Sequence, residues 1–287
     1  MTVFDDIKLQ YKIGGVANRI IYWNVGAFLV SLIFFYQFKV GAFSYPKWLV
    51  LSSNPNDLVY FPNTLLTYAF LHSGFWHLFF NMSVLNFSSR LFLTFFTQKQ
   101  FLGLYVLSAI FAGLAFVLGY YFLNLSSTLV GASAAVMAIL VAATTYQPLM
   151  QIRLLLIGTI KLWHLTAVIL LLDAMQVMTE NTGGHIAHLA GAFFGFVYIK
   201  LLINGTDLSI LVSKVLDFFV NLFQPSKKTP FRKVHVNPKK PSNKSASKIV
   251  IKDKHQQQID EILDKISQSG YDALTAEEKE FLFKAGK

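Results

Sequence analysis

Residues 101–123 read FLGLYVLSAIFAGLAFVLGYYFL, a run of 23 residues without a charged side chain. About 20 consecutive apolar residues are enough for a helix to cross a bilayer, so this run predicts a membrane-spanning helix. The whole chain of 287 residues is similarly apolar, with 54% hydrophobic and 14% charged residues. A soluble domain usually carries about 25% charged residues. No alternating barrel pattern is present, so the sequence predicts an all-α integral membrane protein.

Five further apolar runs accompany this one, and together they predict a bundle of six transmembrane helices. Lys and Arg are concentrated before the first run, between the second and third, between the fourth and fifth, and after the sixth. Because positive residues favour the inner face, both termini are predicted to be cytoplasmic. No signal peptide is expected, and the absence of Cys excludes disulfides. The predicted spans are 20–38, 74–96, 101–123, 132–147, 162–178 and 184–204.

The composition changes after the last run and divides the chain into four parts. Residues 225–254 contain ten Lys or Arg and one Asp, together with Pro, Ser and Asn, which is typical of a flexible linker. Such a linker is expected to favour anionic lipid, and nucleic acid is not a predicted partner. The predicted parts are a cytoplasmic lead (1–18), the six-span domain (19–205), a basic flexible linker (206–255) and a cytoplasmic helical hairpin of unknown role (256–287).

Polar residues at membrane depth are costly and often mark a functional site. Three clusters occupy the first turns of spans two, four and six, which all descend from the outer face. At about 1.5 Å rise per residue, the clusters share one depth, within roughly 10 Å of the helix starts. A nucleophile, a base and hydrogen-bond donors in one layer indicate an acyl-transfer site. The clusters are His72, His77 and Asn81; Gly131 and Ser133; and His185, His188, Gly191 and Gly195.

Other interpretations of these residues stay open at this point. A lone membrane serine such as Ser133 commonly bonds the carbonyl one turn back. His185 and His188 could face a metal together, but no acidic ligand is evident near them, so neither a metal nor a cofactor is predicted. Asp173, near the outer end of span five, receives no role. A small transporter would spread its polar residues through the depth of the membrane and show inverted repeats, which this sequence does not.

At these motifs the sequence resembles the rhomboid family of intramembrane serine proteases. The motifs are HxxxN at His77 and Asn81, GxS at Ser133, and HxxGxxxG at His188, in the order found in the family. The resemblance implies a catalytic dyad of Ser133 and His188 with no third carboxylate. It implies that His77, Asn81 and the Ser133 backbone amide form the oxyanion hole. It also implies that His72 shapes the site or holds water there.

Four positions depart from the family's common pattern. Ala134 follows the nucleophile where Gly is common, and Met137 replaces a Tyr that supports the histidine ring in many bacterial members. Ring support must therefore differ in this chain. Ser89 and Leu93 stand where the family often has Gly and Glu. None of these changes removes a group that takes part in bond chemistry.

The resemblance implies a serine endopeptidase that cuts transmembrane substrates near the outer face of the membrane. Its expected partners are single-span membrane proteins and the lipid bilayer, and its expected location is a bacterial cytoplasmic membrane. The main alternative is a catalytically inactive rhomboid-like protein that binds membrane clients. Such relatives have usually lost the serine or the histidine, and this chain keeps both.

Overall fold

The computed structural model describes residues 2–154, 157–177, 181–223 and 254–285, in two compact units whose relative placement is not defined. The first unit, Met1–Lys227, is a bundle of apolar helices. Each of the six ranges predicted as spans overlaps one helix, and three of these helices begin two to five residues before the predicted range. These helices are α2 (Gly15–Phe34), α5 (Phe75–Leu93), α6 (Gln98–Leu123), α7 (Ser133–Tyr146), α8 (Leu162–Gln176) and α9 (Thr182–Ile203).

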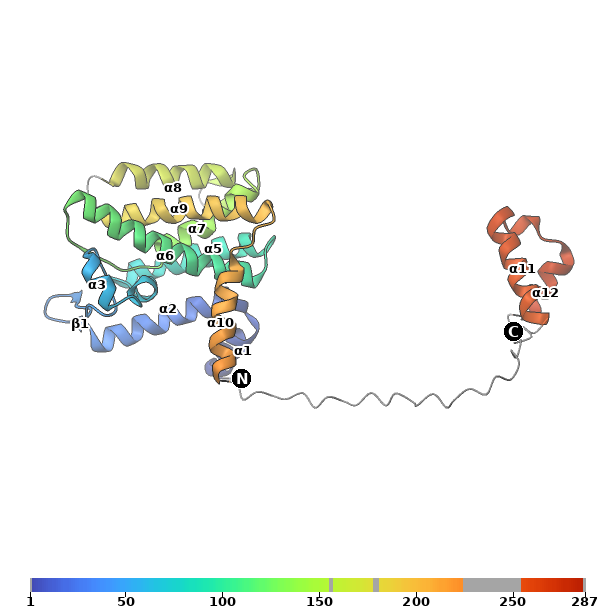
Figure 1. Ribbon diagram of the computed structural model, residues 1–287, viewed down its shortest axis with the longest axis horizontal. Coiled ribbons are helices and arrows are strands. Elements are labelled where there is room, and N and C mark those ends of the chain that lie inside the picture. The colour runs from blue at the N-terminus through green and yellow to red at the C-terminus, as the bar shows by residue number, and fades with distance from the viewer. Residues whose placement is uncertain (1, 155–156, 178–180, 224–253, 286–287) are drawn as a thin grey trace, which may run out of the picture. The chain divides into compact units, whose positions relative to one another are not determined.

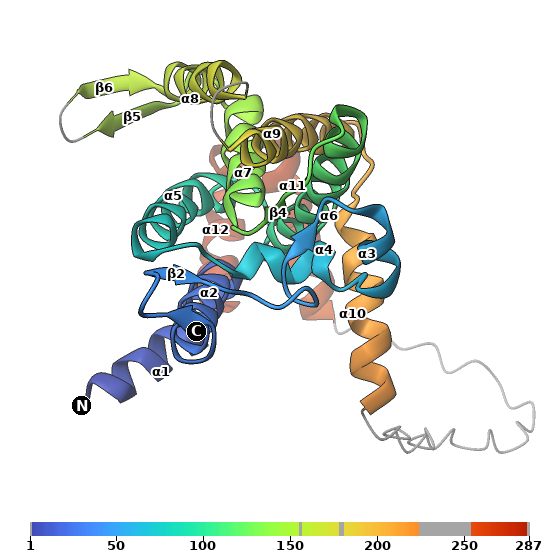
Figure 2. The ribbon, with the colours of Figure 1, turned by 90° about the vertical axis from the view of Figure 1, so that its left-hand side faces the viewer.

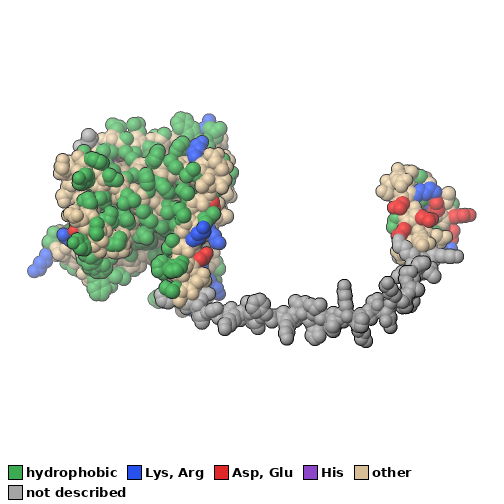
Figure 3. Space-filling view, viewed as in Figure 1, with side chains coloured by type: hydrophobic (Ala, Val, Ile, Leu, Met, Phe, Trp, Pro, Cys, Tyr) green, Lys and Arg blue, Asp and Glu red, His purple; other side chains and the backbone are tan. Residues whose placement is uncertain are grey.

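The bundle helices run side by side in Figure 1 and are seen nearly end-on in Figure 2. Helix α7 packs against α5, α6, α8 and α9, and its Ala-rich sequence is buried on most sides. Three helices in the described part of the chain, α2, α6 and α9, are long and apolar enough to cross a membrane. Hydrophobic side chains cover the flank of this unit in Figure 3, as expected for a surface that faces lipid.

The segment between α2 and α5 contains short elements that cover one end of the bundle. Strand β3 (Leu51–Ser52) pairs antiparallel with β4 (Thr128–Leu129), which lies just before α7. This pairing connects the long first loop to the backbone that leads into the serine. The other elements of the segment are β1 (Tyr36–Gln37), β2 (Ala42–Phe43), α3 (Pro55–Tyr60), α4 (Thr64–Thr67) and the 3-10 helix η1 (Tyr68–Phe70).

The linker prediction for residues 206–255 is wrong at its beginning, because α10 occupies Ser209–Phe223. Its apolar residues recur at helical spacing, and it packs against α6 while running across the direction of the bundle helices (Figure 1). Asp207 starts the helix by accepting from the Ser209 backbone amide at 2.8 Å and from Gln100 Nε2 at 3.2 Å. Burial opposes ionisation of Asp207, but these hydrogen bonds outweigh it and hold its pKa below the ordinary value. Residues 224–253 of the predicted linker lie outside the described residues, and its last two residues, 254–255, belong to helix α11 (Lys254–Ser269).

Two further elements of the first unit flank the bundle helices. Helix α1 (Val3–Ile13) precedes α2, within the range predicted as a lead. Strands β5 (Gln151–Leu154) and β6 (Gly158–Lys161) form an antiparallel ribbon between α7 and α8, which extends outward beside α8 in Figure 2.

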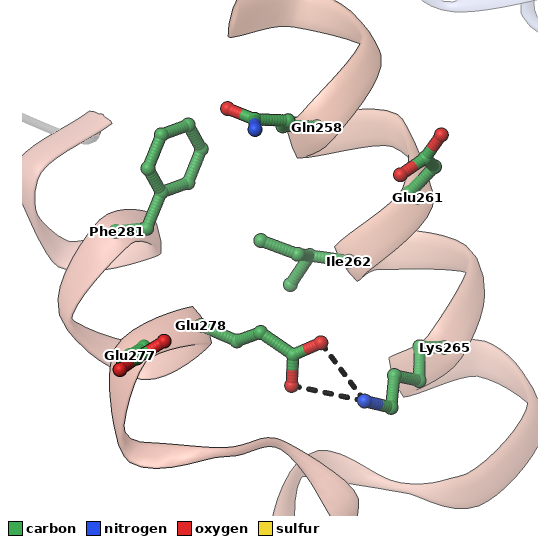
Figure 4. Close-up of a pocket in the computed structure, with 7 residues that line it drawn as sticks. All are labelled: Gln258, Glu261, Ile262, Lys265, Glu277, Glu278 and Phe281. Atoms are coloured by element: carbon green, nitrogen blue, oxygen red, sulfur yellow. Dashed lines mark hydrogen bonds and ion pairs between the residues drawn. The ribbon is translucent and has the colours of Figure 1, made fainter.

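The second unit contains α11 (Lys254–Ser269), the 3-10 helix η2 (Tyr271–Ala273) and α12 (Ala276–Ala285), in the range predicted as a hairpin. Thr275 and Glu278 form a capping box at the start of α12, with the Thr275 amide donating to Glu278 Oε2 at 2.7 Å and the Glu278 amide donating to Thr275 Oγ1 at 3.3 Å. Lys265 of α11 donates to both Glu278 oxygens at 2.8 and 3.0 Å (Figure 4). This ion pair joins the two helices beside the apolar contact face that includes Ile262 and Phe281.

Candidate active site

Ser133 is the first residue of α7, so its backbone amide belongs to the first helical turn, whose N–H groups have no partner within the helix. The backbone reaches it through Gly131, which has φ +130° and donates its amide to the Tyr68 carbonyl at 2.9 Å. A Cβ at Gly131 would lie 2.9 Å from His77 Nε2 and 3.5 Å from Ser133 Oγ. Glycine is therefore needed both for the backbone conformation and for an open space bordered by these two side chains.

Close packing of α7 and α9 brings the serine to a histidine. Ser133 Oγ lies 2.6 Å from His188 Nε2, although the two residues are 55 positions apart. A Cβ at Gly191 would overlap the Ala134 carbonyl, and one at Gly195 would overlap the Ala138 carbonyl. The two glycines therefore let the α9 backbone touch the α7 backbone along the face that carries the serine.

An acidic residue lies beside His188, contrary to the expectation of a site without a third carboxylate. Asp173 Oδ1 of α8 lies 3.0 Å from His188 Nδ1 and 2.5 Å from His185 Nδ1. Asp173 was missed because it belongs to a different helix, and its distance from His188 depends on how α8 packs against α9. The available signal was its position near the outer end of its span, at the depth of the other polar clusters.

The predicted oxyanion-hole residues His77 and Asn81 lie one turn apart on α5. Asn81 Nδ2 donates to the His77 carbonyl at 2.8 Å, and its side chain is buried. The Ser73 backbone amide donates to His77 Nδ1 at 3.3 Å. Because that nitrogen is an acceptor, a neutral His77 carries its hydrogen on Nε2, the atom that borders the open space next to Ser133.

His72 lies beside this group rather than in contact with the serine. Its ring meets the His77 ring edge-on at a centroid distance of 5.1 Å, and its carbonyl accepts from Tyr45 Oη at 2.8 Å. The His72 side chain is fully buried. Its contact with His77 is consistent with the predicted site-shaping role.

Two neighbouring cavities meet at Ser133, His77 and His188. The larger measures about 730 Å³, and its walls include Ser73, Tyr45 and Gly184. The smaller measures about 240 Å³, is almost entirely apolar, and lies between α5 and α8 with Asn81, Met137 and Ile169 in its walls. The serine hydroxyl is therefore reached both from a larger cavity with polar and apolar walls and from an apolar cleft in the side of the bundle.

In the described part of the chain, one group of side chains could hold a metal ion, and it consists of Asp173, His185 and His188. Their candidate ligand atoms all lie within 4.8 Å of one another. The Nδ1 atoms of both histidines are already joined to Asp173 Oδ1 by hydrogen bonds. Metal binding would therefore compete with the contact that orients His188.

Comparison with known families gives two matches along the chain. The model of the Rhomboid domain matches residues 62–205, which include Ser133, His188, Asp173, His77 and Asn81. The chain belongs to the rhomboid family. A second model, a family of unknown function (DUF6576), matches residues 250–284, which cover most of the helical hairpin. No curated protein and no solved structure matches the chain.

The departures from the rhomboid pattern can be located in this rhomboid domain. Ala134 contacts Gly191 through its backbone, so its small side chain suits the close helix contact. Met137 lines the apolar cleft and packs against the core. Ser89 and Leu93 lie on α5, where the Ser89 hydroxyl donates to the Asn86 carbonyl within the same helix at 3.0 Å.

Proposed function

We propose that this rhomboid-family protein is an intramembrane serine endopeptidase that uses Ser133 as nucleophile and His188 as general base. The observation that carries the proposal is the 2.6 Å distance between Ser133 Oγ and His188 Nε2. A serine hydroxyl is a weak nucleophile unless a base can take its proton. The distance is within hydrogen-bond reach, which such a proton transfer requires.

The reaction follows the order of serine acyl transfer. Ser133 Oγ attacks the substrate carbonyl carbon while its proton passes to His188 Nε2. The carbon–nitrogen bond then breaks, and His188 returns this proton to the leaving amine. A water molecule gives its proton to His188, attacks the acyl carbon and releases the acid, and Ser133 regains a proton from His188.

The negative charge on the substrate oxygen is stabilised by donors around the open space at Gly131. The proposed donors are His77 Nε2–H, the Asn81 side-chain amide and the Ser133 backbone amide. The 2.9 Å distance from His77 Nε2 to the Cβ point of Gly131 supports the first of these. Asn81 Nδ2 donates one hydrogen to the His77 carbonyl at 2.8 Å, and the second hydrogen of this amide is the proposed donor to the substrate oxygen. Such donors typically contribute about 100- to 1000-fold in rate.

The substrates are proposed to be single-span membrane proteins that are cut near the outer face. The apolar cleft between α5 and α8 supports entry of a hydrophobic segment from the bilayer. The larger cavity, whose walls include Ser73 and Asn181, supports access of water. A substrate helix must unwind to expose its scissile carbonyl, so residues of low helix propensity are expected near the cut.

The membrane arrangement is part of the same proposal. Six helices cross the bilayer with both termini in the cytoplasm, and a bacterial cytoplasmic membrane is the proposed location. Most Lys and Arg of the face shown in Figure 3 gather at the end of the bundle where α10 lies, which supports this orientation. The basic residues of the linker are proposed to bind anionic lipid.

The test is cleavage of a labelled single-span substrate by the purified full-length chain in detergent. Wild type should cleave it and should be labelled at Ser133 by a fluorophosphonate. Ser133→Ala should do neither. Equal cleavage by the variant, or labelling at another residue, would reject the assignment. A folded wild type that neither cleaves a panel of such substrates nor reacts with the probe would instead favour an inactive membrane-client binder.

A further inference from the structure

Asp173 joins two histidines of α9 through a single oxygen atom. Its Oδ1 lies 3.0 Å from His188 Nδ1 and 2.5 Å from His185 Nδ1. The exposed fractions of the side chains are 10% for Asp173, 12% for His185 and 20% for His188. Hydrogen bonds to a charged group in such a shielded site are stronger than those between neutral groups, so they hold both rings in place.

The direction of these hydrogen bonds fixes where each ring carries its hydrogen. An ionised carboxylate can only accept, so Nδ1 of His188 must be the donor. The Nε2 atom of a neutral His188 then has a free lone pair, and this atom lies 2.6 Å from Ser133 Oγ. The contact with Asp173 therefore selects the ring form that can take the serine proton.

His185 acts on Asp173 rather than on the serine. It lies three residues before His188 on the same helix face, and its ring meets the His188 ring edge-on at a centroid distance of 5.8 Å. By donating to Oδ1 it restricts rotation of the Asp173 carboxylate. Met137, which stands where many relatives have a ring-supporting Tyr, offers no hydrogen bond of this strength.

We propose that Asp173 is a positioning residue for His188 and that His185 holds Asp173 in place. The proposal rests on the proposed protease function and adds a carboxylate to its serine–histidine pair. Once the serine proton has been transferred, the same carboxylate stabilises the positively charged His188 ring. The chain thereby assembles a Ser-His-Asp arrangement from α7, α9 and α8.

The first test measures fluorophosphonate labelling and the kcat and KM of substrate cleavage in full-length variants. Asp173→Asn should lower the labelling rate and kcat by about 100- to 10,000-fold with KM nearly unchanged. The reason is that the Asn amide can donate to His188 Nδ1, which favours the neutral ring with its hydrogen on Nε2, and this form cannot take the serine proton. His185→Leu should lower kcat by about tenfold, a loss of one orienting hydrogen bond, and His185→Gln should recover part of it because Gln keeps a donor. Asp217→Asn, the same change at an exposed site on α10, is the control and should leave labelling unchanged.

Comparison with Ser133→Ala separates the two proposals. If Ser133→Ala is inactive but Asp173→Asn keeps wild-type kcat, Asp173 does not position the base and only this inference falls. If wild type and Ser133→Ala cleave equally, the protease assignment itself falls. A rise in KM with unchanged kcat in Asp173→Asn would assign Asp173 to substrate binding and also overturn the inference.

The second test does not depend on a variant of Asp173 that folds. Nitrogen NMR of ¹⁵N-histidine-labelled wild type, with His188 assigned by comparison with His188→Gln, should show hydrogen on Nδ1 of a neutral ring. Hydrogen on Nε2 would overturn the proposal. Loss of activity in a metal chelator that is restored by Zn²⁺ would assign the trio to a metal ion and would also overturn it.

Discussion

Replacing Gly191 by alanine tests whether close helix contact sets the geometry of the site. A Cβ at this position would lie 2.9 Å from the Ala134 carbonyl carbon and closer still to its oxygen. Carbon atoms pack at about 3.5–4.0 Å, so relief of the carbon–carbon overlap alone requires α9 to move away from α7 by roughly 0.6–1 Å, and the closer oxygen makes this a lower limit. His188 lies one turn before Gly191, and Ser133 adjoins Ala134, so this movement acts directly on the 2.6 Å contact between serine and histidine.

The expected result is a loss of activity together with a moderate loss of stability. Lengthening the Oγ–Nε2 distance to roughly 3.5 Å breaks the hydrogen bond. A misplacement of about 1 Å at a reacting group typically costs on the order of 100-fold in rate. Overpacking of this kind destabilises by about 1–3 kcal/mol, which lowers the unfolding temperature of the detergent-solubilised protein.

Two matched glycine substitutions serve as controls. Gly26→Ala changes a bundle-helix position with no atom within 4 Å of the new Cβ, and it should leave both labelling and stability unchanged or slightly improved. Gly195→Ala makes the same type of clash against Ala138, one turn further from the site, and should destabilise equally with a smaller loss of labelling. The reasoning is refuted if Gly191→Ala reacts with fluorophosphonate at the wild-type rate while losing as much stability as Gly195→Ala.

Three other predictions concern the oxyanion hole, the start of α9 and the hairpin. Asn81→Ala should lower kcat by about 100- to 1000-fold with the unfolding temperature nearly unchanged, and an unaltered kcat would remove Asn81 from the oxyanion hole. Tyr120→Phe removes the phenol oxygen that accepts from the Gly183 amide at 2.9 Å. Thermal unfolding should show that the free energy of unfolding falls by about 1 kcal/mol. An unchanged free energy of unfolding would show that another acceptor replaces this bond in solution. In the hairpin, hydrogen bonds from the Lys265 side chain and the Thr275 amide lower the pKa of Glu278 below its ordinary value of 4.5. Ionised Glu278 therefore stabilises the folded hairpin fully above pH 4.5. This stabilisation disappears as the pH falls through the lower pKa of the folded state. In the wild-type full chain, the protection of α12 amides from hydrogen exchange should fall in that acidic range. If a Glu278→Gln variant loses protection over the same pH range, Glu278 is not the group responsible.

The positions of the bundle helices could be predicted from the sequence because the cause is local. A backbone in lipid must satisfy its own hydrogen bonds, so a long apolar run becomes a helix wherever it crosses. For example, α6 covers Gln98–Leu123 where the run 101–123 predicts a span. Helix α10 was not predicted because the strongly basic residues that follow it give the range 206–255 the composition of a linker. The signal for the helix was the apolar spacing of its own residues, which Lys214 and Asp217 do not interrupt.

The sequence by itself determined which polar residues share a depth. Helix rise converts the distance from a helix start into depth, so Ser133, His77 and His188 could be assigned to one layer from topology alone. The motifs also identified the glycines of the α7–α9 contact, because small residues at a spacing of four form a face along which backbones can approach.

Only the tertiary structure decided which residues of that layer touch. The rotation of each helix about its axis and its choice of neighbours depend on packing across the whole bundle, which local spacing does not encode. Asp173 belongs to the same predicted layer as His188, yet their contact exists only because α8 lies against α9 with the carboxylate turned toward Nδ1. The support of the His188 ring, left open where Met137 replaces tyrosine, is therefore supplied by a residue that sequence spacing could not connect to it.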